Sequence, residues 1–146
     1  MFMKPIKAEQ SWTTYVLSSL LESWSASRAS GTAPLPALIA LSHRLGVSSI
    51  SAVAFGSVFD LAEACLGRSL SVNRCCSNDL PAGEWALIHM LNETLRDGDI
   101  AALGAASGEL IDALVAAATS ARRLLAPQEH ELDRLWHTVH AARLSH

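Results

Sequence analysis

The chain has 146 residues, 50% of them hydrophobic and 17% charged, with a net charge of −3. This length predicts one domain spanning residues 1–146, and a composition this apolar excludes a disordered polar chain. No part of the chain has the strongly basic balance that nucleic-acid binding uses, so we expect no nucleic-acid partner. Acidic residues such as Asp60, Glu63 and Asp112 interrupt every apolar stretch, so we also expect no membrane span.

Cysteine usage and the N-terminal residues predict a cytoplasmic protein. The chain has three cysteines, an odd number, and its first twelve residues lack the apolar centre of a secretory signal. Both features favour a reducing compartment. Arginine and alanine are abundant relative to lysine, which indicates a GC-rich bacterial genome.

Helical periodicity dominates the sequence and predicts an all-α fold, an irregular or orthogonal bundle of five to six helices. The first predicted helix runs from about Ala8 to Ser25, because large apolar residues recur every four positions at Trp12, Val16, Leu20 and Trp24. A stretch rich in Ser, Gly, Ala and Pro, residues 25–34, then breaks the pattern.

Two further helices follow, each with a terminating glycine. Pro36 is placed to open the second, which Gly46 ends as a C-terminal cap. Ser48 can cap the third, which is apolar on nearly every side until Gly67 closes it. Such a helix belongs in the centre of a bundle. We therefore expect it to be buried, with nearly inaccessible side chains at Phe55, Val58 and Leu61.

The second half of the chain is predicted to hold a long loop and three helices. The loop spans residues 68–79 and is briefly extended at 70–72. A fourth helix runs to about Arg96, with Leu80 and Trp85 at the spacing of a hydrophobic staple. One long helix spans residues 99–125, with weak points expected at Gly104 or Gly108. Pro127 starts the last helix, whose predicted inner face is Leu132, Leu135, Trp136 and Val139.

The segment from Leu41 to Ser48 resembles the first helix and the turn of helix-turn-helix DNA-binding domains. In those domains the second helix reads bases through Arg, Lys, Asn or Gln side chains. Residues 48–65 contain none of these four residue types. The composition of the second helix therefore favours an ordinary helical hairpin.

The predicted loop and the helix after it concentrate the candidate binding residues. Arginines beside a thiol favour the thiolate, so a loop cysteine could be reactive if it is exposed. Adjacent cysteines fit a tetrahedral zinc site poorly, and we expect no metal. On the last helix, Asp133, His137 and His140 share a face that we interpret as solvated. The candidate binding residues are Arg68, Arg74, Cys75, Cys76, Asp79, Trp85 and His89.

Catalytic templates are absent from the sequence. It has no Gly-x-Ser-x-Gly elbow and no phosphate-cradling glycine loop, and acids such as Glu63 and Glu84 are interpreted as ordinary helix-surface residues. We expect no catalysis and no cofactor. The segment 61–67, the adjacent cysteines and the helix that follows resemble small all-helical proteobacterial proteins of unknown function, a resemblance that implies no activity.

The sequence thus predicts a helical interaction or regulatory module. A chain so apolar has more hydrophobic surface than one small core covers, and the Ala/Gly-rich face of residues 99–125 suits contact with a copy, so we expect a homodimer. A separate protein partner is also compatible with the sequence. Two alternatives remain open: a small-molecule-binding domain with an apolar pocket between the third helix and the loop, and a thiol or metal sensor at Cys75 and Cys76.

Overall fold

The computed structural model describes residues 12–72, 80–92, 98–104 and 108–144. For the end of α7 it describes side chains only as far as Leu125 and again at Thr138 and Val139. Within the described residues the fold is all-α, as periodicity predicted. The helices are α2 (Trp12–Ser30), α3 (Pro34–Leu45), α4 (Ser49–Leu66), α5 (Ala82–Leu91), α6 (Asp99–Ala102) and α7 (Gly108–Leu144).

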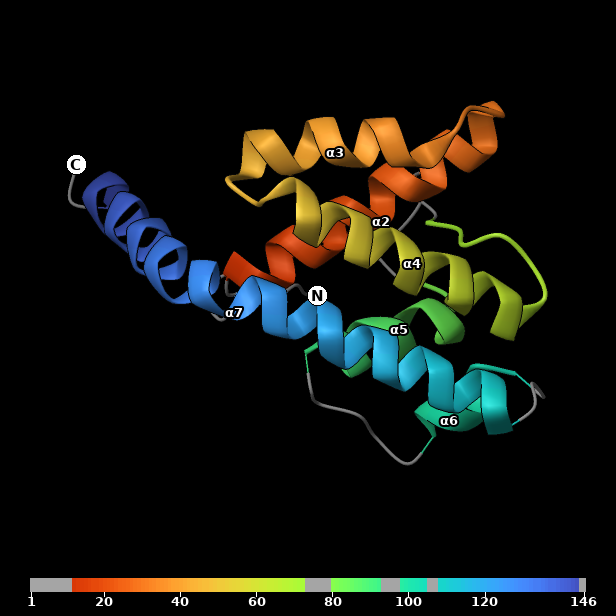
Figure 1. The fold of residues 1–146 in the computed structure, drawn as a ribbon. Coiled ribbons are helices and arrows are strands. Elements are labelled where there is room, and N and C mark those ends of the chain that lie inside the picture. The colour runs from red at the N-terminus through yellow and green to blue at the C-terminus, as the bar shows by residue number, and fades with distance from the viewer. Residues whose placement is uncertain (1–11, 73–79, 93–97, 105–107, 145–146) are drawn as a thin grey trace.

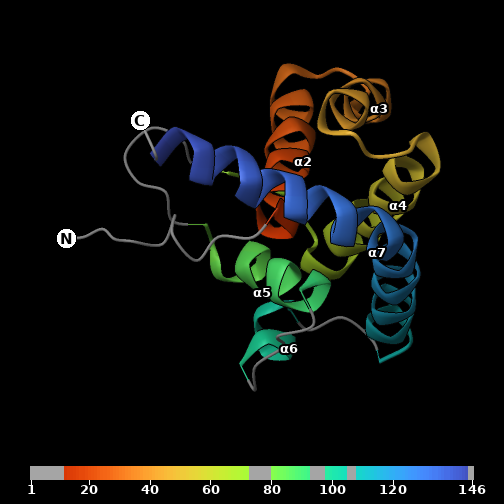
Figure 2. The same cartoon turned by 90° about the vertical axis from the view of Figure 1, so that its left-hand side faces the viewer.

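The helices form two layers. In Figure 1, α4 lies between α3 above it and α7 below it, and α3 and α4 with the first half of α7 make the front layer. The back layer holds α2, α5 and α6, as the side view in Figure 2 shows. Apolar side chains from both layers meet between them, so the core is the space behind α4.

The inner side of α4 is the centre of this core. Phe55, Val58 and Phe59 are all 0% exposed, which confirms the predicted burial of the first two. Trp24 of α2 meets the edge of Phe59 with ring centroids 5.4 Å apart. Such edge-to-face contacts are favourable between aromatic rings beyond the area they bury. The tryptophan stripe of α2 therefore packs directly against α4.

Capping residues set both ends of the α3–α4 hairpin as predicted. Gly46 has a positive φ of 79° and its amide bonds to the carbonyl of His43, which ends α3. The Ser48 side chain accepts the Ser51 amide at the start of α4. Gly67, with φ 70°, ends that helix. Glycine meets the steric demand of a left-handed cap without strain.

Two predicted boundaries at the start of the chain were wrong. Helix α2 continues past Ser25 to Ser30, because serine and alanine do not stop a helix whose inner positions still pack, and Ser27 is 7% exposed. The helix ends at Gly31, which adopts a positive φ of 73°. Helix α3 begins at Pro34 rather than Pro36, while the predicted start of the first helix lies outside the described residues.

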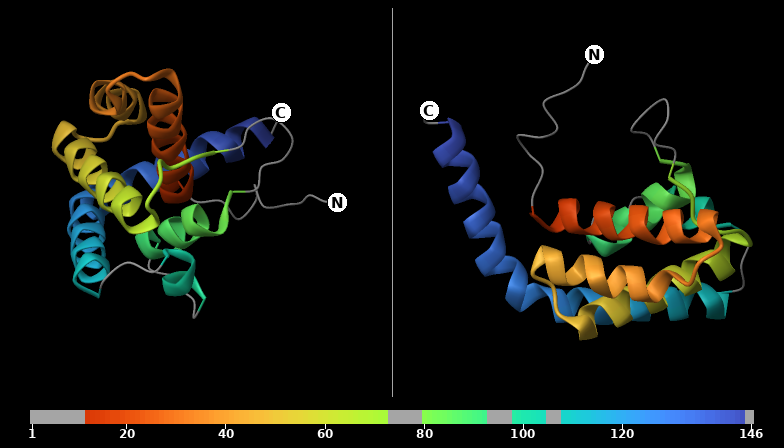
Figure 3. Two further views of the ribbon diagram at one scale, coloured as in Figure 1. Left: turned by 90° about the vertical axis from the view of Figure 1, so that its right-hand side faces the viewer. Right: turned by 90° about the horizontal axis from the view of Figure 1, so that it is seen from above.

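The separate last helix was wrong, and the helix predicted over 99–125 is divided at Gly104, one of its two expected weak points. Residues 99–102 form the short α6, and Gly104 breaks the helix with φ 95° while it packs close to the Cys65 carbonyl. From Gly108, α7 continues without interruption through the position of Pro127 to Leu144. Proline lacks an amide hydrogen and crowds the preceding turn, so it bends a helix. We attribute to it the change of direction along α7 in Figure 3.

Helix α4 is not buried all round, contrary to expectation. Leu61 is only partly buried, and Ile50 and Val53 on the outer side of the helix are 69% and 46% exposed. Among the described residues, α4 is the one helix long and apolar enough to cross a membrane, although we expected none. This is weak evidence for a span, since the core helix of a soluble protein passes the same test.

The second half of the bundle departs from prediction at two further points. Helix α5 ends at Leu91, not Arg96, which lies outside the described residues. Its start is as predicted, since Leu80 precedes the N-cap Pro81 and Trp85 is the fourth helical residue, the spacing of a hydrophobic staple. On α7, Val139 is 53% exposed and so belongs to no inner face, and the other predicted members of that face lie outside the described side chains.

Candidate functional site

The joint between α4 and α5 is built around a buried carboxylate, that of Glu84. This side chain lies in the first turn of α5 and is 0% exposed, so the prediction that it lies on the helix surface was wrong. Arg68 donates to both of its oxygens, at 2.7 and 2.8 Å, and the Ser71 amide donates to Oε2 at 2.8 Å. Three donors offset the cost of removing a charged group from water.

Glu63 of α4 holds the same loop from the other side. Its Oε2 accepts the Trp24 indole hydrogen at 2.9 Å and the Leu70 amide at 3.0 Å. Arg28 of α2 pairs with its Oε1 at 2.9 Å and also lies 5.0 Å from the Trp24 ring centre. The Glu63 side chain is 12% exposed, so this residue too was wrongly assigned to the surface.

The start of the predicted loop is therefore fixed to three helices. The amides of three consecutive residues, Leu70, Ser71 and Val72, donate to side chains of α4, α5 and α2, the last to Ser25 Oγ at 3.0 Å. Leu70 is 2% exposed and anchors the segment in the core. Residues 70–72 belong to neither a helix nor a strand, because their amides donate to side chains of the surrounding helices.

The loop residues proposed for chemistry are mostly beyond this fixed segment. Arg74, Cys75, Cys76 and Asp79 lie outside the described residues. The structure places Arg68 against Glu84, and the hydrogen bond to that carboxylate raises the pKa of the guanidinium. The Arg68 charge is thus balanced within the joint between α4 and α5.

Trp85 and His89 form a second cluster, on the outer side of α5. Their rings stack with centroids 5.7 Å apart and an interplanar angle of 24°. His89 Nδ1 lies 3.1 Å from Oδ2 of Asp99, the first residue of α6, which is 8% exposed. A carboxylate at this distance places the ring hydrogen on Nδ1. The carboxylate partner was missed in the sequence, where residues ten apart carry no pairing signal.

Neither the thiol nor the metal chemistry considered for this chain finds a site in the described residues. Cys65 is 5% exposed, and burial raises the pKa of its thiol, so it stays protonated and unreactive. Among the described residues, no three His, Cys, Asp or Glu side chains lie close enough together to hold a metal ion. The side chains of Asp133, His137 and His140 lie outside the description.

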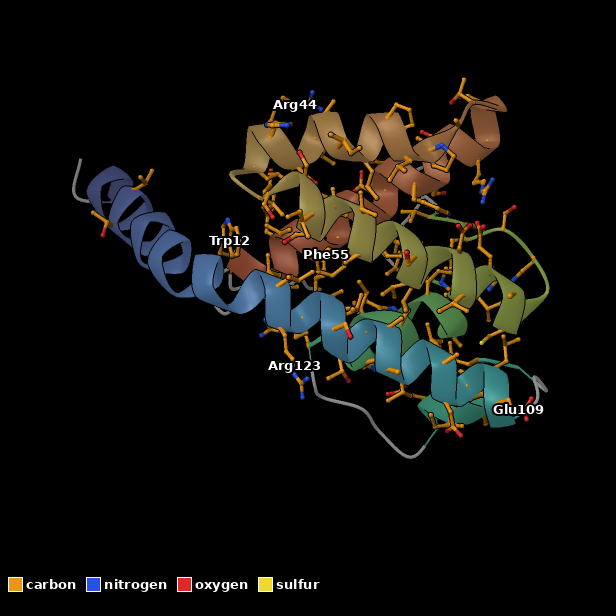
Figure 4. The ribbon with its side chains drawn as sticks, viewed as in Figure 1. Trp12, Arg44, Phe55, Glu109 and Arg123 are labelled. Atoms are coloured by element: carbon orange, nitrogen blue, oxygen red, sulfur yellow. The ribbon has the colours of Figure 1, made fainter. Side chains whose placement is uncertain are left out.

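A shallow groove of about 260 Å³ runs between α2 and α3. Glu22 of α2 and Arg44 of α3 place opposite charges on its walls, beside small residues of α2. Arg44 points away from the helices beneath it in Figure 4. The groove is open to solvent and about as polar as it is apolar, which is unlike the enclosed, mainly apolar pockets that hold most small ligands.

The outer side of α4 carries an exposed apolar surface, which we call the α4 face. It consists of Ile50 and Val53, which lie one turn apart, with Ser49 and Ser57 beside them on the same side of the helix. Leu35 of α3 and Leu124 of α7, on the two helices that flank α4, are 38% and 42% exposed. Residues 49–59 include no charged side chain.

The α3–α4 hairpin also bears on the resemblance to helix-turn-helix domains. The hairpin forms, but the exposed first turns of α4 present Ile50 and Val53 where those domains carry Arg, Lys, Asn or Gln side chains for base edges. Comparisons with known proteins returned no matching family model, no similar curated protein and no similar solved structure.

Proposed function

We propose that the protein is a non-catalytic interaction module that binds another protein chain through the α4 face. One observation carries this proposal: Ile50 is 69% exposed on the very helix that forms the centre of the core. The core-facing side chains of α4, such as Phe55 and Phe59, are fully buried without any contribution from Ile50, so packing of the core does not require a large apolar side chain at position 50.

The make-up of the α4 face supports this function. A single exposed apolar residue is ordinary on a protein surface, whereas a group of them marks contact sites. Ile50 and Val53 are adjacent on one helix, and the stretch around them is uncharged. Uncharged apolar centres are what protein interfaces bury. We further propose that the module works in the cytoplasm of a bacterium, which the odd number of cysteines and the abundance of arginine and alanine relative to lysine support.

Photo-crosslinking in the cells that make the protein tests the proposal. A photoreactive phenylalanine analogue replaces Ile50, and matched variants carry it at Ile100 and Val115, which are 40% and 39% exposed on other surfaces. We expect one adduct, identified by mass spectrometry, at position 50 and little at the two control positions. Equal adducts at all three positions, or none at position 50, would contradict a contact surface on α4.

A second candidate function, small-molecule binding, is favoured by the cluster of Trp85, His89 and Asp99. Trp85 is 40% exposed, and its ring is held by the stacked His89, which Asp99 orients. A rigid, open indole is a surface on which a planar ligand can stack. Native mass spectrometry of the purified protein tests this: a retained small molecule that Trp85→Ala releases supports it, and the bare chain mass argues against it.

A further inference from the structure

The second half of α7 projects out of the bundle. The helix changes direction near Pro127, and from there to Leu144 it extends past the other helices in Figure 1 and in the right-hand view of Figure 3. We call residues 128–144 the α7 arm, which is about 25 Å long at the rise of an α-helix. Helices in proteins owe most of their stability to the packing of an apolar face, so a projecting arm calls for a partner.

The apolar stripe that packs the first half of α7 into the core continues along the α7 arm. The buried members of the stripe are Leu114, Ala118, Ala121 and Leu125. Leu132 and Val139 lie seven and fourteen residues after Leu125, and Leu135 and Ala142 follow each of them by three. This is the heptad spacing at which two helices pack along their length. Val139 is 53% exposed, so at this position the described part of the chain leaves the stripe uncovered.

Charged residues divide the α7 arm into an acidic start and a basic end. Residues 128–133 include Glu129, Glu131 and Asp133 and no Lys or Arg, whereas residues 134–144 include Arg134 and Arg143 and no acid. Two antiparallel arms bring the acidic start of each level with the basic end of the other. Parallel arms would place the two acidic starts together, where like charges repel.

From the projection, the heptad stripe and the divided charge, we infer that the α7 arm pairs with the α7 arm of a second copy of this chain, in the antiparallel direction. The register that aligns the two stripes has its twofold axis near position 137. It brings Leu135 of one copy level with Val139 of the other, and Glu129 level with Arg143. Reciprocal contacts about such an axis define a closed, symmetric dimer.

This contact goes beyond the proposed function, because the α7 arm and the α4 face are separate surfaces. In the right-hand view of Figure 3 the arm extends to the side away from α4, so pairing of the arms leaves the α4 face uncovered. The dimer contact expected in the helix predicted over residues 99–125 is thereby placed after Pro127.

The mass of the purified full chain tests the dimer. We expect light scattering at tens of micromolar to give twice the chain mass of 15.6 kDa. Val139→Arg places a charge in the middle of the paired stripe and should weaken dimerisation at least about tenfold. Val115→Arg, at a 39% exposed position in the first half of α7, is the matched control and should leave the dimer intact. Circular dichroism checks that both variants are folded. A monomeric wild type, or a dimer that tolerates Val139→Arg, overturns the inference.

A charge exchange tests the antiparallel direction. Arg143→Glu places an acid level with Glu129 of the copy at two symmetric positions, so it should weaken the dimer about fivefold or more at low salt. Adding Glu129→Arg to this variant restores opposite charges and should restore the affinity. Arg123→Glu, at an exposed position before the arm, should have little effect. A double variant that dimerises no better than Arg143→Glu alone would overturn the antiparallel direction.

Disulfide crosslinking tests the register. Cys75→Ser and Cys76→Ser remove the two loop thiols, and the buried Cys65 is kept. In this background, Thr138→Cys places a thiol beside the proposed axis, whereas Glu131→Cys places the two thiols of the dimer about 18 Å apart along the paired helices. We expect oxidation with a copper catalyst to link the copies rapidly through position 138 and little through position 131. Equal linking through both positions would indicate parallel arms and contradict the register.

Discussion

The joint between α4 and α5 and the α4 face show opposite relations between residue type and burial. At the joint, Glu84 carries a charge and is 0% exposed, while on the α4 face Ile50 is apolar and 69% exposed. The two sites are connected by one helix, and each inverts the usual distribution of polar and apolar residues. The joint is satisfied by partners within the chain, whereas Ile50 on the apolar face stays exposed in the part of the chain that the structure describes.

This difference shows that a buried charge and an exposed apolar side chain need different explanations. A buried carboxylate with three donors is fully explained by the fold, so the joint calls for no ligand. Exposed apolar side chains on a core helix gain nothing from the fold. The comparison therefore assigns a structural role to Glu84 and supports the contact role that we propose for Ile50.

The largest expected effect separates the two sides of α4. Phe55→Ala removes a fully buried ring and should lower the free energy of unfolding by about 3–5 kcal/mol. Val53→Ala, on the exposed side of the same helix, should change it by less than about 0.5 kcal/mol. Denaturant unfolding of dilute protein measures both. Similar losses from the two variants would show that α4 has no outer face.

The next effect tests the buried carboxylate. Glu84→Gln keeps the shape of the side chain but places an amide group among hydrogen-bond donors. It should therefore lower the free energy of unfolding by about 1.5–3 kcal/mol. It should also speed hydrogen exchange at the Ser71 amide, which donates to Glu84. Glu109→Gln, at an exposed position of α7, is the control and should leave the free energy of unfolding almost unchanged. An unchanged stability for Glu84→Gln would mean that the joint does not support the fold.

A smaller effect concerns the third attachment of the loop. Ser25→Ala removes the acceptor of the Val72 amide, and we expect a loss of about 0.5–1.5 kcal/mol. Ser30→Ala, at an exposed position at the end of α2, provides the comparison. Thermal unfolding resolves the difference between them. If the two serine variants have the same melting temperature, the loop is held by the carboxylates of Glu63 and Glu84 alone.

The smallest effect concerns Cys65, because burial raises the pKa of its thiol. Because the folded protein disfavours the thiolate, this group costs no stability at neutral pH, and stability falls only as the pH rises above the ordinary thiol value of about 8.5. In the Cys75→Ser, Cys76→Ser background, alkylation of Cys65 should follow global unfolding. Labelling at the rate of a free cysteine would show that the α4–α7 contact opens readily.

The candidate site was predictable only in part. His89 was identified in the sequence as a candidate binding residue, but its partner Asp99 lies on a different helix. Glu63 and Glu84 looked like surface residues, since a carboxylate in an amphipathic helix usually faces solvent. Their donors come from residues 7 to 39 positions away, which no local pattern reveals.

The sequence by itself determined the all-α class, the α3–α4 hairpin with its caps at Gly46, Ser48 and Gly67, and the inner stripe of α2. These features depend on neighbours within one or two helical turns, so the local sequence contains their physical causes. Only the tertiary structure decided that α7 continues past Pro127 and that Ile50 faces solvent while Glu84 is enclosed. Burial depends on which helices lie beside a side chain, and that is set by the packing of the two layers.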